Sequence, residues 1–212
     1  MTTARCARRP VLSLTLVFAV LRVAAVALAA AMVAACSHYD ELVTEDQAAA
    51  QKWADVEAQV QRRYDLVPNV VATVKASAAH EEATLKAVAD ARAHATGVTL
   101  SAEDLEDPAK VAAFQKAQDN LHGALSRLIA TQEAYPDLKA NAQFHDLMIE
   151  LEGTENRIAR AREEYNKAVG QYNAMLGHVS GQVVNRVTGR PFKPRAYFSA
   201  SSEAQSAPRV SF

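Results

Sequence analysis

Apolar residues recur at alternating intervals of three and four positions along most of this chain, from about residue 42 to residue 179. The most regular stretch contains Val111, Leu121, Leu125 and Leu128, and Trp53 lies on the first stretch, where we expect it to be a core residue. This spacing places the side chains in one narrow stripe along an α-helix, which is typical of helices that pack side by side at about 20°. No useful alternation of apolar and polar residues precedes about residue 180. The sequence therefore predicts an all-α fold.

Helix-breaking residues divide this pattern into separate segments. Pro68 has no amide hydrogen to donate, so it either starts the second helix or kinks a longer one. Gly97 has the typical position of a residue that ends a helix, while the run 101–104 and the pair Asp107 and Pro108 are typical of a helix start. A further break falls at Pro136. We expect an antiparallel up-down four-helix bundle with long helices near residues 40–64, 66–96, 103–134 and 138–178.

The helical pattern ends near residue 178, and residues 179–212 differ in composition. Gly181, Gly189, Pro191 and Pro194 interrupt any helical repeat. The basic and aromatic residues of this stretch include Arg186, Arg190, Lys193, Arg195, Phe192, Tyr197 and Phe198. We expect an irregular, partly ordered C-terminal tail laid over the end of the bundle. The alternative is a docking strip for a partner or for the membrane interface.

The first 35 residues are typical of a bacterial export signal. Arg5, Arg8 and Arg9 precede an apolar stretch over residues 11–35 that only Arg22 interrupts. The stretch ends in Val-Ala-Ala followed by Cys36, which resembles a lipobox, where the cysteine becomes the acylated first residue of the mature protein. We therefore expect a signal segment over residues 1–35, lipidation of Cys36, and a bundle domain over residues 36–178.

An uncleaved transmembrane helix is the alternative anchor. The apolar stretch exceeds the roughly 20 residues that span a bilayer, but an arginine at mid-membrane costs about 2.5–3.5 kcal/mol. With either anchor the N-terminal arginines stay in the cytoplasm and the domain is exported. By resemblance to sorted lipoproteins, Ser37 favours the outer membrane, facing the periplasm, in a bacterium with two membranes. The helical anchor would hold the domain at the inner membrane.

Charge and cysteine content exclude several kinds of partner and site. Beyond residue 35, Asp and Glu exceed Lys and Arg, which gives a formal net charge of about −5. This charge argues against nucleic acid and against anionic lipid headgroups as partners. Because Cys6 leaves with the signal and Cys36 is acylated, the domain has no thiol for a disulfide, a zinc site or nucleophilic catalysis.

No catalytic or metal-binding motif is complete. His80 and Glu81 begin an H-E-x-x-H pattern, but Thr84 occupies the position of the second histidine that zinc requires. Asp119 and His122 form a single acid-x-x-His pair, whereas a di-iron bundle needs two Glu-x-x-His pairs and two further glutamates. We expect no cofactor, no metal ion and no enzymatic activity.

Polar residues accompany the apolar stripe of the fourth predicted helix, namely Glu155, Asn156, Asn166 and Asn173. Because asparagine is a mediocre helix former, this pattern indicates buried polar contacts. The candidate partners lie at the first helix junction and are Arg62, Arg63, Asp65 and Asn69. We expect a hydrogen-bonded layer that aligns the helices, in which Arg62 or Arg63 lies near Glu155. The alternative is a cleft around Arg62, Glu155 and Asn156 that binds a peptide or a small ligand.

Several runs of sequence resemble the LemA proteins, which are bacterial membrane-attached helical-bundle proteins. The runs are YDELV at 39–43, RRYDLVPNVV at 62–71, AYPDLKAN at 134–141 and ELEGTENRI at 150–158, and the resemblance covers about residues 39–178. The Phe-Pro that commonly follows the last helix of the family is absent, since residues 175–178 read MLGH, but residues 191–198 again resemble the family. The resemblance implies a membrane-attached helical bundle, and it supplies no enzymatic activity.

These features predict a non-enzymatic protein of the bacterial envelope, anchored to the membrane, that acts as an interaction or scaffold module for other envelope proteins. A bundle that senses a ligand or peptide through its polar layer is the alternative. The sequence leaves open whether the chain forms a homo-oligomer.

Overall fold

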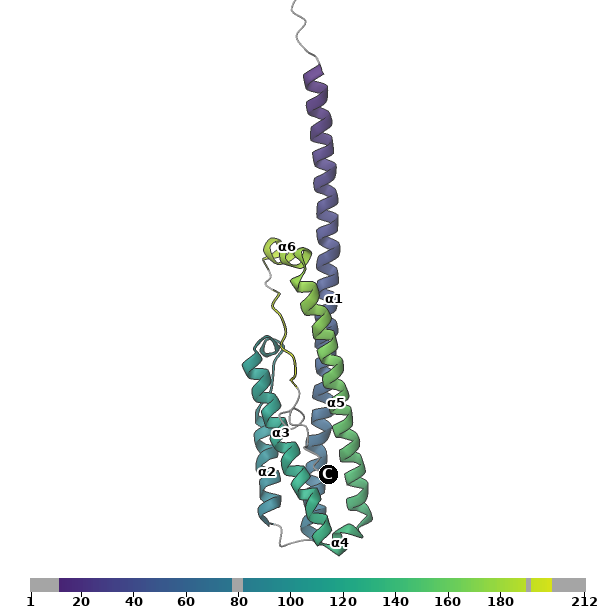
Figure 1. Ribbon diagram of the computed structural model, residues 1–212, viewed down its shortest axis with the longest axis vertical. Helices are drawn as coiled ribbons and strands as arrows, with labels where there is room; N and C mark the ends of the chain where they lie inside the picture. Colours follow the sequence, from purple (N-terminus) through teal and green to yellow (C-terminus); the bar gives the residue numbers. More distant parts are fainter. Residues whose placement is uncertain (1–11, 78–81, 190–191, 200–212) are drawn as a thin grey trace, which may run out of the picture.

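The computed structural model describes residues 12–77, 82–189 and 192–199, which are helical apart from turns and one extended stretch (Figure 1). The longer helices are α1 (Leu12–Ser77), α2 (Glu82–Gly97), α3 (Pro108–Thr131) and α5 (Ala142–Gly177). The shorter ones are η1 (Asp104–Glu106), η2 (Gln132–Ala134), α4 (Pro136–Lys139) and α6 (Val179–Thr188). Because the described residues contain no β-strand, the prediction of an all-α fold is confirmed.

The C-terminal half of α1 lies beside α2, α3 and α5, and successive long helices run in opposite directions (Figure 1). α1 packs most extensively against α5, α2 packs against α3, and α1 also contacts α2. The N-terminal half of α1 continues beyond the other described helices (Figure 1). Within the described part of the chain, no helical stretch has both the length and the hydropathy needed to cross a membrane.

The first predicted helix boundary, at residues 64–66, is wrong because α1 continues through Pro68 to Ser77. A proline removes the hydrogen bond to the carbonyl group four residues earlier, which here belongs to Tyr64. Arg92 of α2 supplies the missing donor, since its Nε lies 2.9 Å from that carbonyl oxygen. The apolar residues that this part of α1 buries are Val67, Val70 and Val74. The helix therefore continues because a distant residue and the core both stabilise it.

The other helix ends follow local capping chemistry. α2 ends at Gly97, as predicted. α3 begins at Pro108 rather than near residue 103, because the carboxylate of Asp107 caps its first turn while the run 101–104 leads into η1. α5 begins at Ala142 rather than near residue 138, because the side chain of Asn141 caps it and α4 is a separate turn.

The core lies between the facing sides of the long helices. Trp53 is 6% exposed, which confirms it as a core residue, and its ring centroid lies 5.5 Å from that of Phe114 and 5.9 Å from that of Tyr165. Edge-on aromatic pairs contribute about 0.5–1.5 kcal/mol beyond the burial of their area. Phe198 stacks on the same indole at 6.0 Å. A residue from the far end of the described chain thus completes the core around the first helix.

Residues 179–188 form α6, where the sequence predicted the start of an irregular tail. This helix folds back against α5 and α1 and buries Val184 in a small cluster with Leu42. At Gly181 a side-chain carbon would lie 2.5 Å from the carbonyl oxygen of Met175, so the close approach of α6 requires glycine. Sequence reasoning treated Gly181 as a helix breaker and missed this packing role. Gly189, with a φ angle of 64°, then ends the helix.

Residues 192–199, called the C-terminal segment below, return along the helices as an extended stretch (Figure 1). The segment lies along the sides of the long helices, and not only over the end of the bundle as predicted. It is tied to η1 by a backbone hydrogen bond from the Ala196 amide to the Leu105 carbonyl oxygen at 2.7 Å. Its other polar contacts go to helical side chains.

Candidate functional site

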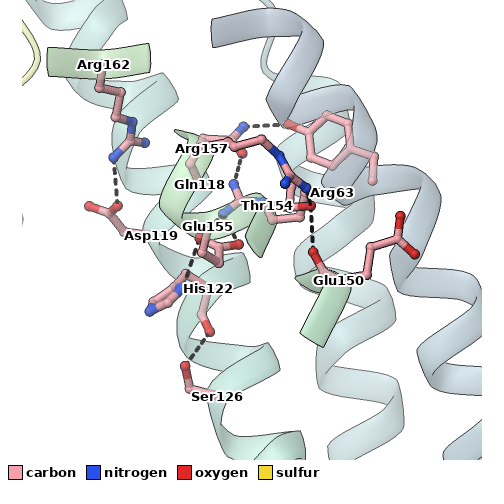
Figure 2. Close-up of polar contacts among 11 residues, drawn as sticks. Arg63, Gln118, Asp119, His122, Ser126, Glu150, Thr154, Glu155, Arg157 and Arg162 are labelled. Atoms are coloured by element: carbon pink, nitrogen blue, oxygen red, sulfur yellow. Dashed lines mark hydrogen bonds and ion pairs between the residues drawn. The ribbon is translucent and has the colours of Figure 1, made fainter. Parts of the chain in front are cut away.

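Arg63 is the centre of a polar layer between α1, α3 and α5 (Figure 2). Its side chain is only 2% exposed. Its Nη1 donates to both carboxylate oxygens of Glu155 on α5, at 2.9 and 3.1 Å, and its Nη2 donates to Oε1 of Gln118 on α3. Burying a guanidinium costs several kcal/mol unless an opposite charge and hydrogen bonds offset it. The contacts of Arg63 therefore fix the relative positions of three helices.

The layer continues from Gln118 to α2. The Nε2 of Gln118 donates to the hydroxyl oxygen of Tyr64, and that hydroxyl donates to the carbonyl oxygen of Ala95 at 2.9 Å. Gln118 occupies the apolar stripe of α3 and is buried. One connected chain of hydrogen bonds thus links α1, α2, α3 and α5.

Glu155 is a fixed negative charge within this layer. Burial raises the pKa of its carboxyl group, but a hydrogen bond with His122 and the charge of Arg63 outweigh burial and hold the pKa below its ordinary value. The Nδ1 of His122 lies 3.3 Å from the Oε2 of Glu155. The carboxylate therefore stays ionised at neutral pH, which suits a counter-ion for Arg63 rather than a general acid.

Arg162 adds a longer ion pair beside this layer, with its Nη1 3.8 Å from the Oδ1 of Asp119 (Figure 2). Burial lowers the pKa of the Arg162 guanidinium, and the charge of Asp119 opposes this effect. The Nε atoms of Arg63 and Arg162 are buried, and no described residue accepts a hydrogen bond from them. These two N–H groups are the unsatisfied donors of the layer.

The structure brings Arg63, and not Arg62, to Glu155. Arg62 is exposed and its Nη2 instead lies 2.7 Å from the Oε1 of Glu150. The other predicted layer residues that are exposed are Asp65, Asn69 and Asn156. The prediction of buried polar contacts is wrong for Asn156, and the candidate partners Asp65 and Asn69 also face solvent. The position of each residue around its helix decides its exposure, since Tyr64 and Thr154, next to Arg63 and Glu155, are buried. Sequence alone did not fix this rotation.

Asn166 and Asn173 do not join Arg63; they hold the C-terminal segment. The side-chain amide of Asn166 donates to the Phe198 carbonyl oxygen at 2.8 Å and accepts from the Phe198 amide at 2.9 Å. Asn173 makes the same pair of bonds with the backbone of Arg195, both at 2.9 Å. Each asparagine therefore satisfies backbone groups that an extended chain would otherwise pair with a neighbouring strand.

The spacing of the two asparagines matches the geometry of both backbones. Asn166 and Asn173 are seven residues apart on α5, and seven helical residues rise about 10.5 Å. Arg195 and Phe198 are three residues apart, and three residues of extended chain span about 9–10 Å. The seven-residue spacing of the two asparagines on α5 therefore matches the distance between the two backbone positions that they bind on the extended segment.

The tyrosine before each asparagine has the same relation to the segment. The Tyr165 hydroxyl donates to the Ala196 carbonyl oxygen at 3.2 Å, and the Tyr172 hydroxyl donates to that of Lys193 at 2.9 Å. Burial raises the pKa of both phenols to about 12. Both hydroxyl groups therefore remain protonated donors over the ordinary pH range.

Gln115 and Asn185 complete this set of side-chain amides. Gln115 donates to the Ser199 carbonyl oxygen at 2.8 Å and accepts from its amide at 3.2 Å, and Asn185 pairs with Phe192 at 2.9 and 2.7 Å. Sequence reasoning missed both residues, because their partners lie in a tail predicted to be irregular. The only available signal was a side-chain amide in a helix with no obvious role.

The side chains of the segment also occupy defined positions. Phe198 lies 5.4 Å from the ring of Tyr165, beneath the guanidinium of Arg162. Arg195 is 8% exposed, and its Nε and Nη2 each lie 2.9 Å from the Oδ1 of Asp46 on α1. These contacts tie the segment to α1 and α5 through charge and aromatic packing as well as through its backbone.

The predicted lipidation site lies on the surface of α1. Cys36 is exposed with a free thiol, and the helix continues on both sides of it. Among the described residues, no cluster of His, Cys, Asp and Glu has the arrangement of a metal site. His80 and Glu81 lie outside the described residues. The sites that the structure describes align helices and bind an extended backbone.

Comparison with known proteins identifies the family of the chain. The sequence model of the LemA family matches residues 52–212. Similar curated proteins are the magnetosome protein MamQ of Magnetospirillum gryphiswaldense, 28% identical over 176 residues, and the magnetosome proteins MamQ 1 and MamQ 2 of Paramagnetospirillum magneticum, each 29% identical over 178 residues. Each alignment covers 76% of this chain and 64% of the relative, so the chain spans less than two thirds of the length of these relatives. Because the family match covers most of the sequence, including the polar layer and the C-terminal segment, the chain belongs to the LemA family.

Proposed function

We propose that this chain is a membrane-attached, non-enzymatic protein of the bacterial envelope whose helical bundle acts as an interaction or scaffold module. The domain is exported, and acyl chains on Cys36 or the N-terminal part of α1 hold it to the membrane. The acylated form lies at the outer membrane of a bacterium with two membranes, facing the periplasm, and the helical form lies at the inner membrane. The four long helices form one up-down bundle, and other envelope proteins bind its surface.

The exposed apolar surface of α1 supports membrane attachment most directly. Its members are Val17, Phe18, Val20, Leu21, Val23 and Val26, which are 52–70% exposed on the part of α1 beyond the other described helices. Single exposed apolar residues are ordinary, but a contiguous apolar surface in water is unfavourable. A membrane would cover this surface, and cleavage before Cys36 would remove it.

The polar layer supports a non-enzymatic role. Arg63, Glu155 and Gln118 use their charges and hydrogen bonds on one another. The lowered pKa of Glu155 gives a permanently ionised group at neutral pH, whereas proton transfer needs a pKa near the working pH. The layer therefore suits the alignment of helices that carry an interaction surface.

A second candidate function is a bundle that senses a small ligand or a peptide through this layer. The buried Nε donors of Arg63 and Arg162 favour it, because no described residue accepts their hydrogen bonds. Acetate and inorganic phosphate are suitable probes. A rise in melting temperature with either anion, lost in Arg162→Ala, would favour this candidate over the scaffold.

Membrane attachment is tested by fractionating cells that produce the full chain. We expect the protein to sediment with membranes and to stay there after a carbonate wash at alkaline pH. Val20→Arg combined with Val23→Arg should move it to the soluble fraction, because each arginine in an apolar anchor or signal costs about 2.5–3.5 kcal/mol.

Val179→Arg is the matched control, since Val179 is an exposed valine on α6, away from the apolar part of α1. This variant should remain with the membranes. Recovery of the unmodified protein in the soluble cytosolic fraction would refute membrane attachment. Cross-linking in intact cells then tests the interaction role, which fails if no protein is captured specifically relative to an unrelated lipoprotein.

A further inference from the structure

The C-terminal segment is bound in the way that a separate peptide would be bound. Side-chain amides pair with its backbone at four residues, and these amides belong to Gln115, Asn166, Asn173 and Asn185. With the hydroxyl groups of Tyr165 and Tyr172, they are called the clamp below. Recognition of an extended backbone by hydrogen bonds, with side-chain positions for selectivity, is a recurring mode of peptide binding. Most clamp contacts lie on α3 and α5, far in sequence from the residues they bind.

The contacts of the segment side chains define which sequence fits the clamp. Arg195 requires the carboxylate of Asp46, and Lys193 pairs with Glu106 at 3.0 Å. Phe198 fills the aromatic site around Trp53. A suitable peptide therefore carries an arginine followed three residues later by an aromatic residue, and charge complementarity with α1 and η1 fixes its direction.

Most contacts of the segment differ from those that hold α6. α6 has its own packing, through the close contact at Gly181 and the burial of Val184. Gly189 follows α6 in the left-handed conformation, which favours glycine, and precedes the segment. If the segment leaves the clamp, α6 loses the hydrogen bonds of Asn185 and the packing of Phe192 but keeps its close contact with α5 at Gly181.

We propose that the clamp is a peptide-binding site whose second occupant is the C-terminal segment of another copy of this chain. The segment of a second copy has the same sequence as the chain's own segment. It would therefore make the same charge and aromatic contacts with the clamp. Reciprocal exchange gives a closed two-fold dimer. Because the chain's own segment is covalently linked to its clamp, its effective concentration there is about 1 mM. The segment of another copy can compete only where the local concentration of the protein is comparable. In this respect the inference rests on the proposed membrane attachment, which concentrates copies on one surface.

Two full-length variants in detergent test the exchange. The segment variant carries Arg195→Ala and Phe198→Ala, so its clamp is intact while its own segment has lost the ion pair with Asp46 and the packing on Trp53 and competes weakly for the clamp. The clamp variant carries Asn166→Ala and Asn173→Ala, so its segment is intact and loses four of its backbone hydrogen bonds to its own clamp. We expect each variant alone to be a monomer by size exclusion with light scattering. Mixing them at concentrations rising toward ~1 mM should double the mass and give a one-to-one complex.

A labelled synthetic peptide of residues 192–199 provides the second arm. The peptide should bind the segment variant. Its affinity for the clamp variant should be at least about 30-fold lower, because two paired backbone contacts are lost. Peptide binding without a mixed complex would overturn the second copy as the occupant. Failure of both arms would overturn the peptide site itself and leave the segment as a structural cover.

Both variants are first compared with the unmodified chain by far-UV circular dichroism. If Phe198→Ala reduces the helix content, the segment variant is made with Arg195→Ala alone. Arg195→Ala leaves the aromatic cluster of Trp53 intact. The outcome is independent of the fractionation experiment. Complex formation between variants can succeed while membrane attachment fails, and the reverse holds as well.

Discussion

Two neighbouring arginines of α1 form ion pairs that differ in burial. Arg63 and Glu155 have side chains 2% and 24% exposed, whereas Arg62 and Glu150 are 53% and 41% exposed. Exposed pairs contribute little because water screens them, while removing one member of a buried pair leaves a charge without compensation. The buried pair therefore provides the sensitive position, Glu155, and the exposed pair provides its control, Glu150.

Glu155→Gln should lower the free energy of unfolding by about 1–3 kcal/mol, because Arg63 would keep a hydrogen-bond acceptor but lose its counter-ion. Glu150→Gln, the matched control, should change it by no more than about 0.5 kcal/mol. Urea denaturation of both variants at pH 7 gives the comparison. Equal effects of the two substitutions would contradict the structural role of the buried pair.

The same residue predicts how stability depends on pH. Because the pKa of Glu155 is lower in the folded state, its contribution is fully present above the ordinary carboxyl value of about 4.5 and disappears as the pH falls through the lowered pKa. Measured in a His122→Asn background, which removes the histidine that also hydrogen-bonds Glu155, the stability lost on Glu155→Gln should therefore be constant from pH 7 to about pH 5 and shrink at lower pH. Denaturation series at several pH values measure it. A difference that grows in acid would contradict the assigned direction.

At the scale of secondary elements, α1 depends on a residue from another helix. Pro68 leaves the Tyr64 carbonyl without its helical donor, and Arg92 provides a replacement. Replacing Pro68 by alanine restores the amide, after which the arginine is no longer needed by that carbonyl group. The two positions should therefore be coupled energetically.

A double-mutant cycle on Pro68→Ala and Arg92→Ala measures this coupling. Pro68→Ala alone should stabilise the chain by about 1–3 kcal/mol, reduced by the greater freedom of its unfolded state. Arg92→Ala alone should cost about 1–2 kcal/mol, and its cost should fall by at least about 0.5 kcal/mol in the Pro68→Ala background. Strict additivity would show that the Arg92 contact does not compensate for proline.

The docking of the C-terminal segment should weaken as the pH becomes strongly alkaline. Tyr165 and Tyr172 donate to its carbonyl oxygens, and a phenolate cannot donate. Their folded pKa values, raised to about 12, exceed the unfolded value of 10.0, so their contribution is complete below pH 10 and is lost as the pH rises through about 12. Limited proteolysis after residue 189 should accelerate between these values. Asn173→Ala should release the segment at neutral pH, and equal protease resistance of both proteins would contradict the prediction.

For the whole molecule, sequence predicted what depends on local pattern and missed what depends on distant partners. The three-four spacing predicted the all-α fold, and the ends of α2 at Gly97 and of α5 at Gly177 fall where the pattern placed them, whereas α3 begins at the second candidate start, Pro108. The continuation through Pro68 depends on Arg92, 24 positions away in the sequence. Whether Arg63 or Arg62 faces Glu155 depends on the rotation of α1 relative to α5, and the local sequence does not determine this rotation. The segment site joins residues up to 149 positions apart, so the heptad repeat of its asparagines was visible in the sequence while the segment that they bind was not.

The nature of the anchor decides how the whole molecule is held, and it can be tested on two cysteines of the same chain. If Cys36 is the lipidation site, intact-mass analysis of the protein purified from membranes should give a chain that begins at Cys36 and carries two or three acyl groups. Cys36→Ser should leave an unprocessed chain of full mass, because the thiol that accepts the lipid is gone. Cys6→Ser is the matched control and should be processed normally, since Cys6 belongs to the signal segment. A full-length mass for the unmodified protein would instead identify the N-terminal part of α1 as an uncleaved anchor, with Cys36 as an exposed thiol on its surface.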